Sequence, residues 1–283
     1  IQVLILGRWK DALESFQTKG AQIEGHPAQK VGVISLKNKQ ARFGQSLVLV
    51  KSRQTEEAAN DLLTYLEKDG LALTLQNGLG NNEKLSSILG KDRVVFGVTT
   101  VGARIIAPGI VKMSGRSEIW IERHPKGALI ENMLRKSNFR VHIVDDIQPH
   151  IWRKLIANCA INPLTGIVRV KNGELLRDPI KRKLMNRLVE ETVNVANSIN
   201  IHLNIGSPQK MVEKITRQTS ENYSSMLQDI LRGAPTEIDA LNGEIIRLGE
   251  KNGVDVSLNK LVYKLVEGGI NYSSVEISGM NDK

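Results

Sequence analysis

The chain has 283 residues, of which 41% are hydrophobic, so it is long enough to bury the cores of two domains of ordinary size. Its apolar runs are shorter than the roughly 18 to 20 residues that a membrane-spanning helix needs, and its one cysteine, Cys159, excludes an intrachain disulfide and makes the cytoplasm the default compartment. The net charge of +9 comes from lysines and arginines spread along the chain, with few aromatic residues and no recognisable base-reading motif, which argues against nucleic-acid binding and suits an anionic small molecule.

The first half of the chain predicts an α/β domain. Short apolar runs separated by turn signals indicate strands, and several runs are continuous, which is typical of parallel strands covered on both faces. The predicted strands are residues 1–6, 46–50, 71–75, 93–103 and 139–144. Helices are predicted over residues 9–20 and 55–70, and an antiparallel excursion over residues 111–122. We expect Thr55 to cap the second helix and Gly70 to follow its end.

After Asp146 the pattern is helical only. The predicted helices are residues 147–164, 179–200, 207–218, 236–253 and 258–269. Ser207-Pro208 is typical of a helix start, and Asn252-Gly253 of a helix end. The sequence therefore predicts a Rossmann-like, doubly wound α/β domain over residues 1–145 and an all-helical domain over residues 146–283. Ligands of such sheets bind at the carboxyl ends of the strands.

Two cations follow predicted strands. If the first predicted strand is the one that follows the usual glycine loop, Arg8 stands where NAD-binding folds place an acidic residue for the ribose hydroxyls. Arginine there would clamp a 2′-phosphate and imply NADP, but a solvated surface arginine fits the position equally well. Lys51, with Gln54 shortly after it, follows the next apolar run, where a lysine is either solvated or directed at a ligand.

The stretch LQNGLGN places Asn77 directly after a predicted strand. Gly78 and Gly80 would permit close approach of the backbone to a ligand. A plain turn explains the same residues, because Asn-Gly is a very common turn dipeptide.

The stretch WRKLIANCAINPLTG carries a polar stripe. On a helix, Lys154, Asn158 and Asn162 are spaced by four residues and drift by only about 40° per step. Such a stripe on an apolar helix needs a polar partner, and an anionic, hydroxylated substrate would supply one. A lysine that reaches solvent beside capping asparagines is the alternative. Pro163 should bend or end the helix around Cys159.

A third polar stretch follows near residue 222. It combines Asn222, Ser224, Ser225 and Glu237. Helix capping by Thr236 explains part of this stretch, but it does not explain the two serines before an apolar Met-Leu pair.

Six stretches, in this order, resemble the ketopantoate reductase family: LVKSRQT, LQNGLGN, FGVTTVGA, WRKLIANCAINPLTG, VKNGELL and SSMLQDILRGAPTEIDALNG. They cover nearly the whole chain, and the long ones are specific. The resemblance implies that Lys154 and Glu237 are catalytic. It implies substrate contacts for Asn77, Asn158, Asn162, Asn222 and Ser225. The cofactor side would include Arg8, Lys51, Gln54, Asn77, Gly78, Gly102 and Ala103.

The reaction implied by this resemblance is hydride transfer from NADPH to the C2 ketone of 2-dehydropantoate, giving D-pantoate for pantothenate and coenzyme A biosynthesis. Lys154 would supply the proton, and Glu237 would help to hold the substrate hydroxyls. No metal, nucleic acid or membrane is expected, and members of the family occur as monomers and as homodimers. Two alternatives stay open: a dehydrogenase of the same two-domain architecture acting on another 2-oxo or 3-hydroxy acid, and, more remotely, a non-catalytic basic binding protein.

The chain departs from the family at its start, where the GxGxxG turn is absent because residue 1 matches the second strand. A strand as apolar as IQVLIL needs a neighbour on each edge. We therefore expect an upstream segment of roughly 20 to 25 residues that carries this turn. For the present chain we expect an incompletely filled sheet beside residues 1–6 and little affinity for NADPH.

Overall fold

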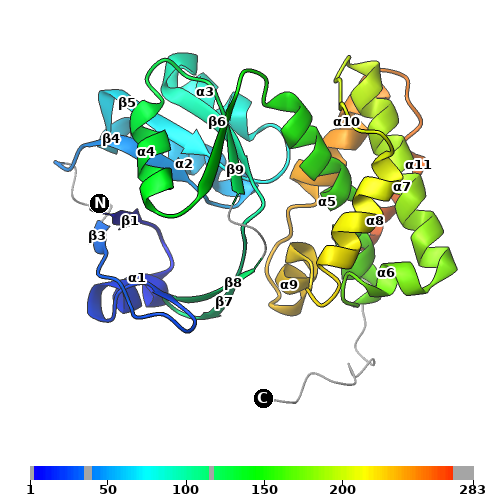
Figure 1. Cartoon of the computed structure of the whole chain (residues 1–283), viewed down its shortest axis with the longest axis horizontal. Coiled ribbons are helices and arrows are strands. Elements are labelled where there is room, and N and C mark those ends of the chain that lie inside the picture. The colour runs from blue at the N-terminus through cyan, green and yellow to red at the C-terminus, as the bar shows by residue number, and fades with distance from the viewer. Residues whose placement is uncertain (1–2, 35–39, 115–117, 270–283) are drawn as a thin grey trace. The chain divides into compact units, whose positions relative to one another are not determined.

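The computed structural model describes residues 3–34, 40–114 and 118–269 (Figure 1). The chain divides into two compact units, Ile1–Lys154 and Leu155–Lys283. The first unit combines strands with helices, and the described part of the second contains helices and turns. Within the three described ranges, no helix is long and apolar enough to cross a membrane.

Five strands form the main sheet of the first unit. They are β4 (Phe43–Val48), β5 (Leu66–Thr74), β6 (Val94–Thr99), β9 (Glu118–Glu122) and β10 (Arg140–Val144). Their order in the sheet is β10-β9-β6-β5-β4, and all neighbours are parallel except the antiparallel pair β6 and β9. The predicted parallel sheet and its antiparallel excursion are therefore confirmed.

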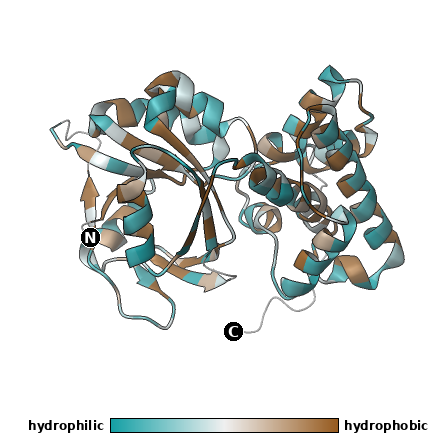
Figure 2. Ribbon diagram, turned by 45° about the horizontal axis from the view of Figure 1, so that its top comes forward, coloured by the Kyte–Doolittle hydropathy of each residue, from teal (hydrophilic) through white to brown (hydrophobic). Residues whose placement is uncertain are grey.

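Helices cover both faces of this sheet, because its strands carry apolar side chains on both sides. Helices α2 (Thr55–Tyr65) and α3 (Asn81–Leu89) pack on one face around Leu62, Ala72 and Leu85. Helix α4 (Ala128–Lys136) packs on the other face around Leu73 and Ile130. In Figure 2 the strands are mainly brown, and teal gathers on the helices beside them. This layering is Rossmann-like, as predicted.

Two smaller sheets complete the first unit. One pairs β1 (Leu4–Leu6) with β3 (Gly32–Ile34) in parallel, with α1 (Lys10–Thr18) between them in sequence; the other has the order β2 (Gln22–Ile23), β8 (Ile110–Ser114), β7 (Gly102–Ala107). Among the described residues, β1 and β4 each have one strand neighbour only. Each of them is an edge strand of its own sheet, so the incompletely filled sheet expected beside residues 1–6 stays a prediction; residues 1–2 lie outside the described ranges.

Two predicted boundaries in the first unit are wrong. The helix predicted over residues 55–70 ends at Tyr65, because Leu66 is already extended and begins β5. Gly70 lies inside that strand, where a Cβ atom would come within 3.0 Å of the Phe43 carbonyl oxygen. The strand predicted over residues 93–103 is two strands, β6 and β7, which belong to different sheets.

The helices of the second unit follow the predicted pattern closely. They are α5 (Gln148–Val168), which begins in the first unit, α6 (Glu174–Arg177), α7 (Pro179–Ser198), α8 (Pro208–Gln218), α9 (Ser225–Leu231), the π-helix η3 (Asp239–Gly243), α10 (Glu244–Lys251) and α11 (Ser257–Glu267). Ser207 caps α8 as expected, because its Oγ accepts from the Lys210 N–H at 3.3 Å.

Of the two outcomes expected at Pro163, a bend or a helix end, the helix end does not occur. Helix α5 continues through Pro163 to Val168. Proline has no N–H and so leaves the carbonyl four residues earlier without its helical donor, here that of Cys159. The side-chain amide of Asn242 replaces the donor, with Nδ2 at 3.0 Å from the Cys159 oxygen. A tertiary hydrogen bond thus lets the helix continue.

Candidate active site

The loops after β4 and β5 lie together at the carboxyl ends of these parallel strands. Lys51 precedes a single 3₁₀ turn, η1 (Ser52–Gln54), and Asn77 follows β5. The Ser52 hydroxyl donates to the Asn77 carbonyl oxygen at 3.2 Å, and the Asn81 side chain donates to the same oxygen at 2.9 Å. The predicted cofactor residues Lys51, Gln54 and Asn77 therefore belong to one hydrogen-bonded loop pair.

A buried polar cluster holds these loops and was not predicted. The Thr55 hydroxyl lies 2.8 Å from both the Ser52 carbonyl oxygen and Asn81 Oδ1. Gln76 donates from Nε2 to Thr55 Oγ1 at 2.9 Å and to the Val50 carbonyl oxygen at 2.7 Å. Thr55 is therefore not the expected N-cap; Gln54 takes that position, and Thr55 joins two loops from inside the helix. Only the proximity of Gln76 and Asn81 to the NGLG stretch hinted at this cluster.

The glycines of the NGLG loop adopt the left-handed conformation. Gly78 has φ 83° and Gly80 has φ 81°, values that side chains other than glycine rarely adopt. Gly80 immediately precedes α3. Gly102 begins β7 and pairs with Ser114, whose hydroxyl would lie 2.6 Å from an added Cβ atom, and Ala103 beside it is exposed. The backbone therefore favours glycine at the two loop positions, whereas at Gly102 a side chain would first have to displace the Ser114 hydroxyl.

Arg8 is engaged by carboxylates of α2. Its guanidinium lies 2.9 Å from Glu57 and 2.8 Å from Asp61, and its side chain is 39% exposed. A phosphate at this position would have to compete with two ion pairs. The arginine therefore lies after β1 as expected, with its charge already balanced in part.

Lys154 lies on α5 in the first unit and is half-buried. Its ammonium group donates to the carbonyl oxygen of Thr99, the last residue of β6, at 2.8 Å. One turn earlier on α5, His150 stacks on Trp120 of β9 with ring centroids 5.4 Å apart. Burial and the nearby Arg153 lower the pKa of His150. Two contacts thus fix the start of α5 on the sheet and hold the lysine at the carboxyl end of β6.

The polar stripe on α5 continues into the second unit. Asn162 is buried, and its Nδ2 lies 3.4 Å from Ser225 Oγ, at the first residue of α9. Asn158 is half-buried one turn before Asn162. No hydrogen-bond partner of the Asn158 side chain is found in the described part of the chain. Amide and hydroxyl groups from two segments therefore meet here.

The two adjacent serines differ in what they contact. Ser224 is buried and caps α9, since its Oγ accepts from the Leu227 N–H at 3.1 Å and lies 2.7 Å from Thr165 Oγ1 on α5. Ser225 is exposed and contacts Asn162. Asn222 is exposed, and its carbonyl oxygen accepts from the Asn172 N–H at 3.0 Å. Capping thus explains one serine and leaves the other available to a ligand.

Glu237 is half-buried and immediately precedes the turn that leads into η3. Its carbonyl oxygen accepts from the Leu241 N–H at 3.2 Å. Thr236 accepts from the Ile238 N–H at 3.4 Å, which is a local turn contact. The backbone of Glu237 is therefore held by the π-helix that follows it.

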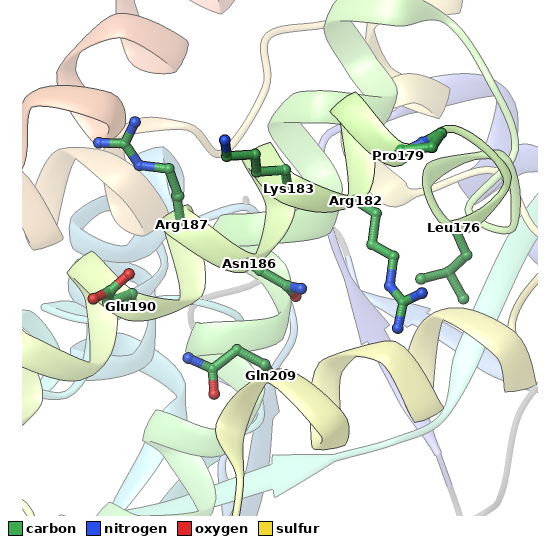
Figure 3. Close-up of a pocket in the computed structure, with 8 residues that line it drawn as sticks. All are labelled: Leu176, Pro179, Arg182, Lys183, Asn186, Arg187, Glu190 and Gln209. Carbon is green, nitrogen blue, oxygen red and sulfur yellow. The ribbon is translucent and has the colours of Figure 1, made fainter.

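A surface cavity of about 410 Å³ lies elsewhere on the second unit (Figure 3). Its lining includes Arg182, Lys183, Asn186 and Arg187 of α7 and none of the predicted site residues. Arg182 is already paired with Glu213 at 2.7 Å. Figure 3 shows Lys183 and Arg187 extending from the opposite side of α7 to Arg182 and Asn186, so the cations do not converge. Across the described ranges, no cluster of His, Cys, Asp and Glu could hold a metal.

Two family models match this chain. The one described as "Ketopantoate reductase PanE/ApbA" matches residues 1–126, and the one described as "Ketopantoate reductase PanE/ApbA C terminal" matches residues 146–269. Among curated relatives, a 2-dehydropantoate 2-reductase of Archaeoglobus fulgidus is 36% identical over 79% of this chain and 75% of its own length. One from Pyrococcus horikoshii is 32% identical over 94% of this chain and 88% of its own length.

Two solved structures are similar to most of this chain. A PanE/ApbA family ketopantoate reductase from Ralstonia eutropha has a TM-score of 0.87 and 30% identity, covering 94% of this chain and 89% of that one. A D-mandelate dehydrogenase with NADH and anilino(oxo)acetate has a TM-score of 0.88 and 25% identity, covering 94% and 90%. The similarity therefore extends over both units of the chain.

Proposed function

Because this chain belongs to the ketopantoate reductase family of oxidoreductases, we propose that it reduces 2-dehydropantoate to D-pantoate with NADPH. The reaction supplies pantothenate and coenzyme A biosynthesis, and we place it in the cytoplasm. Curated relatives that cover most of the chain carry this activity in their names. The observation that supports the chemistry most directly is Lys154, whose ammonium group is held 2.8 Å from the last carbonyl oxygen of β6.

The residues at the strand ends fit a nicotinamide dinucleotide. In open α/β sheets such cofactors bind outside the carboxyl ends of the strands, where this chain has Lys51, Asn77 and the two left-handed glycines. A lysine and the N–H groups of a glycine loop suit phosphate groups. Arg8 suits the 2′-phosphate that distinguishes NADPH from NADH, once its pairs with Glu57 and Asp61 are exchanged. When bound, NADPH supplies the hydride.

In this proposal Lys154 acts on the ketone oxygen. Its ammonium group polarises the carbonyl and donates the proton that the developing alkoxide needs. The hydrogen bond to Thr99 holds the side chain in one direction, so little ordering remains when substrate binds. Glu237 binds substrate hydroxyl groups and completes the catalytic pair.

The polar group formed by Asn158, Asn162 and Ser225 recognises the remaining oxygens. Their amide and hydroxyl groups both donate and accept hydrogen bonds, which matches a substrate that has a carboxylate at one end and a hydroxyl group at the other. Asn222 and Asn77 contribute further donors. Because Asn162 is buried, water cannot replace a hydrogen-bond partner that a different substrate lacks. Burial of Asn162 therefore makes the site selective for substrates that supply this partner.

A spectrophotometric assay of NADPH oxidation tests the proposal. We expect turnover with 2-dehydropantoate and D-pantoate as the product on chiral chromatography. No oxidation of NADPH at millimolar 2-dehydropantoate and saturating NADPH would contradict it.

A second candidate function is favoured by the D-mandelate dehydrogenase, which is solved with NADH. In this candidate the chain would reduce an aromatic 2-oxo acid with NADH. Phenylglyoxylate in place of 2-dehydropantoate, and NADH in place of NADPH, separate the two candidates in the same assay. A higher kcat/KM with phenylglyoxylate and NADH would favour the second candidate.

A further inference from the structure

Pro163 makes one carbonyl group of α5 depend on another segment. The Cys159 oxygen belongs to the residue four positions before Pro163, whose nitrogen carries no hydrogen and cannot donate the usual helical hydrogen bond to it. Cys159 and Asn242 are both fully buried, so water does not replace the donor. Asn242 Nδ2 donates to this oxygen at 3.0 Å, across 83 residues of sequence.

Asn242 lies in η3, close to the candidate catalytic Glu237. The Leu241 N–H donates to the Glu237 carbonyl oxygen at 3.2 Å, and the Gly243 N–H donates to the Ile238 carbonyl oxygen at 3.0 Å. Asn242 lies between these two donors in the same π-helical turn. A shift of Asn242 would therefore move the backbone that carries Glu237.

At its other end the hydrogen bond holds the polar stripe. Cys159 follows Asn158 directly and precedes Asn162 by less than one turn of α5. Asn162 and Thr165 contact the serines of α9, at 3.4 Å and 2.7 Å. The contact between Asn242 and Cys159 is thus a direct link between the segment with Glu237 and the substrate-binding face of α5.

A buried network fixes the orientation of the Asn242 amide. Nδ2 also donates to Asn259 Oδ1 at 2.9 Å, and Asn259 Nδ2 donates to Glu191 at 2.8 Å. Glu191 in turn accepts from the N–H groups of Leu258 and Asn259 at the start of α11, both at 2.9 Å. Asn242 Oδ1 has no partner among the described residues. The network therefore orients the Asn242 amide so that Nδ2 donates to Cys159 and Asn259, although Oδ1 is then buried without a partner among the described residues.

We infer that Asn242 is a positioning residue that compensates Pro163 and, through the Cys159 carbonyl group, holds Glu237 in register with Asn158 and Asn162. The inference rests on the proposed function for its kinetic part. It predicts two separable effects of losing the amide: an unsatisfied carbonyl, which lowers stability, and a lost link, which lowers catalysis. Pro163→Ala separates them, because an alanine N–H satisfies Cys159 without restoring the link.

The test compares Asn242→Ala, Pro163→Ala and the double variant in the full-length protein. Asn242→Ala should lower the folding equilibrium constant by about 5- to 150-fold, the range for a buried group left without its partner. The double variant should recover most of this loss. In Asn242→Ala and in the double variant, kcat/KM for 2-dehydropantoate should be about tenfold or more lower than in Pro163→Ala, as expected when catalytic groups are misplaced. The Kd for NADPH should be the same in all three variants.

Asn172 provides the matched control. It is also buried, its Nδ2 donates to Thr219 at 3.0 Å, and its Oδ1 has no partner among the described residues. Asn172→Ala should therefore be additive with Pro163→Ala in the folding equilibrium constant. If Asn242→Ala alone does not fold, folding of the double variant is the predicted rescue, and a double variant that also fails to fold contradicts the inference.

Three results would overturn it. Additive stabilities of Asn242→Ala and Pro163→Ala would exclude the compensation. Recovery of kcat/KM together with stability in the double variant would make Asn242 merely structural. The third readout is independent of activity: the carboxyl ¹³C resonance of Glu237 should differ between the double variant and Pro163→Ala, and identical resonances would exclude the link. If the wild-type protein does not reduce 2-dehydropantoate, the proposed function fails, while stability and this resonance still decide the role of Asn242.

Discussion

The two units hold their candidate functional residues in different ways. In the first unit the candidate cofactor residues Lys51, Gln54 and Asn77 lie near the carboxyl ends of β4 and β5, where turns and the buried cluster around Thr55 position them. In the second unit Asn158, Asn162 and Ser225 lie on helices, and the contact between Asn162 and Ser225 joins side chain to side chain. Loop residues should therefore act mainly through cofactor affinity. Helix residues should act on substrate, and their buried neighbours on stability as well.

The largest effect is expected for Lys154→Ala. Loss of a positioned acid should lower kcat by about two to four orders of magnitude, while the Kd for NADPH, measured by fluorescence titration, stays unchanged. Lys183→Ala is the control, because Lys183 is an exposed lysine on α7. A Lys154→Ala variant that keeps a third of the wild-type kcat would remove this residue from the mechanism.

The adjacent serines sharpen the comparison within the second unit. Ser225→Ala should lower kcat/KM for 2-dehydropantoate by about 10- to 100-fold, the effect of a lost hydrogen bond to a charged or polar group, with stability nearly unchanged. Ser224→Ala should destabilise the protein by about 1 kcal/mol, because it removes a helix cap, in a urea unfolding experiment. The opposite assignment, with Ser225 controlling stability and Ser224 controlling turnover, would contradict the structure of α9.

A smaller effect on affinity is expected in the first unit. Arg8→Ala should raise the Kd for NADPH about tenfold and leave the Kd for NADH almost unchanged, because only NADPH carries a 2′-phosphate that the guanidinium can bind. Glu57→Gln should strengthen NADPH binding, since it removes one of the two carboxylates that engage Arg8. Isothermal titration with both cofactors measures these changes. Equal losses for NADPH and NADH in Arg8→Ala would make Arg8 structural.

The smallest effect concerns pH and the start of α5. Burial, Arg153 and His142 lower the pKa of His150 in the folded protein, and Asp146 opposes them. Because the pKa of His150 is lower in the folded protein than in the unfolded chain, the neutral imidazole stabilises the fold. This stabilisation is fully present at a pH above the pKa of the unfolded chain, about 6.5, and it is lost as the pH falls through the folded pKa.

His150→Phe keeps a ring against Trp120 and has no titratable group. Its free energy of unfolding should therefore fall less than that of the wild type between pH 8 and pH 5.5. Urea unfolding at the two pH values gives the difference. A wild type and a variant with the same pH dependence would show that His150 does not contribute.

The sequence predicted those features that depend on local pattern. Continuous apolar runs located the strands of the main sheet, and the Lys154, Asn158 and Asn162 spacing located one face of α5.

Features that depend on distant partners were missed. The end of α2 at Tyr65 follows from pairing of Leu66 with Phe43, which the local pattern does not reveal. Pro163 does not end α5, because its missing donor is supplied by Asn242, about 80 residues later. Likewise, the buried contacts of Gln76 and Asn81 join residues more than 20 positions apart. Tertiary hydrogen bonds thus account for the largest corrections.

The most direct test of the account compares 2-dehydropantoate with 3,3-dimethyl-2-oxobutanoate, which differs from it only by lacking the 4-hydroxyl group. If the amide and hydroxyl groups on α5 and α9 recognise that hydroxyl group, kcat/KM with NADPH should fall by about 100-fold or more for the analogue, because the buried Asn162 and its polar neighbours then lose a hydrogen-bond partner. Equal kcat/KM values for the two compounds would show that these residues do not read the hydroxyl group, and would contradict the assignment of 2-dehydropantoate as the substrate.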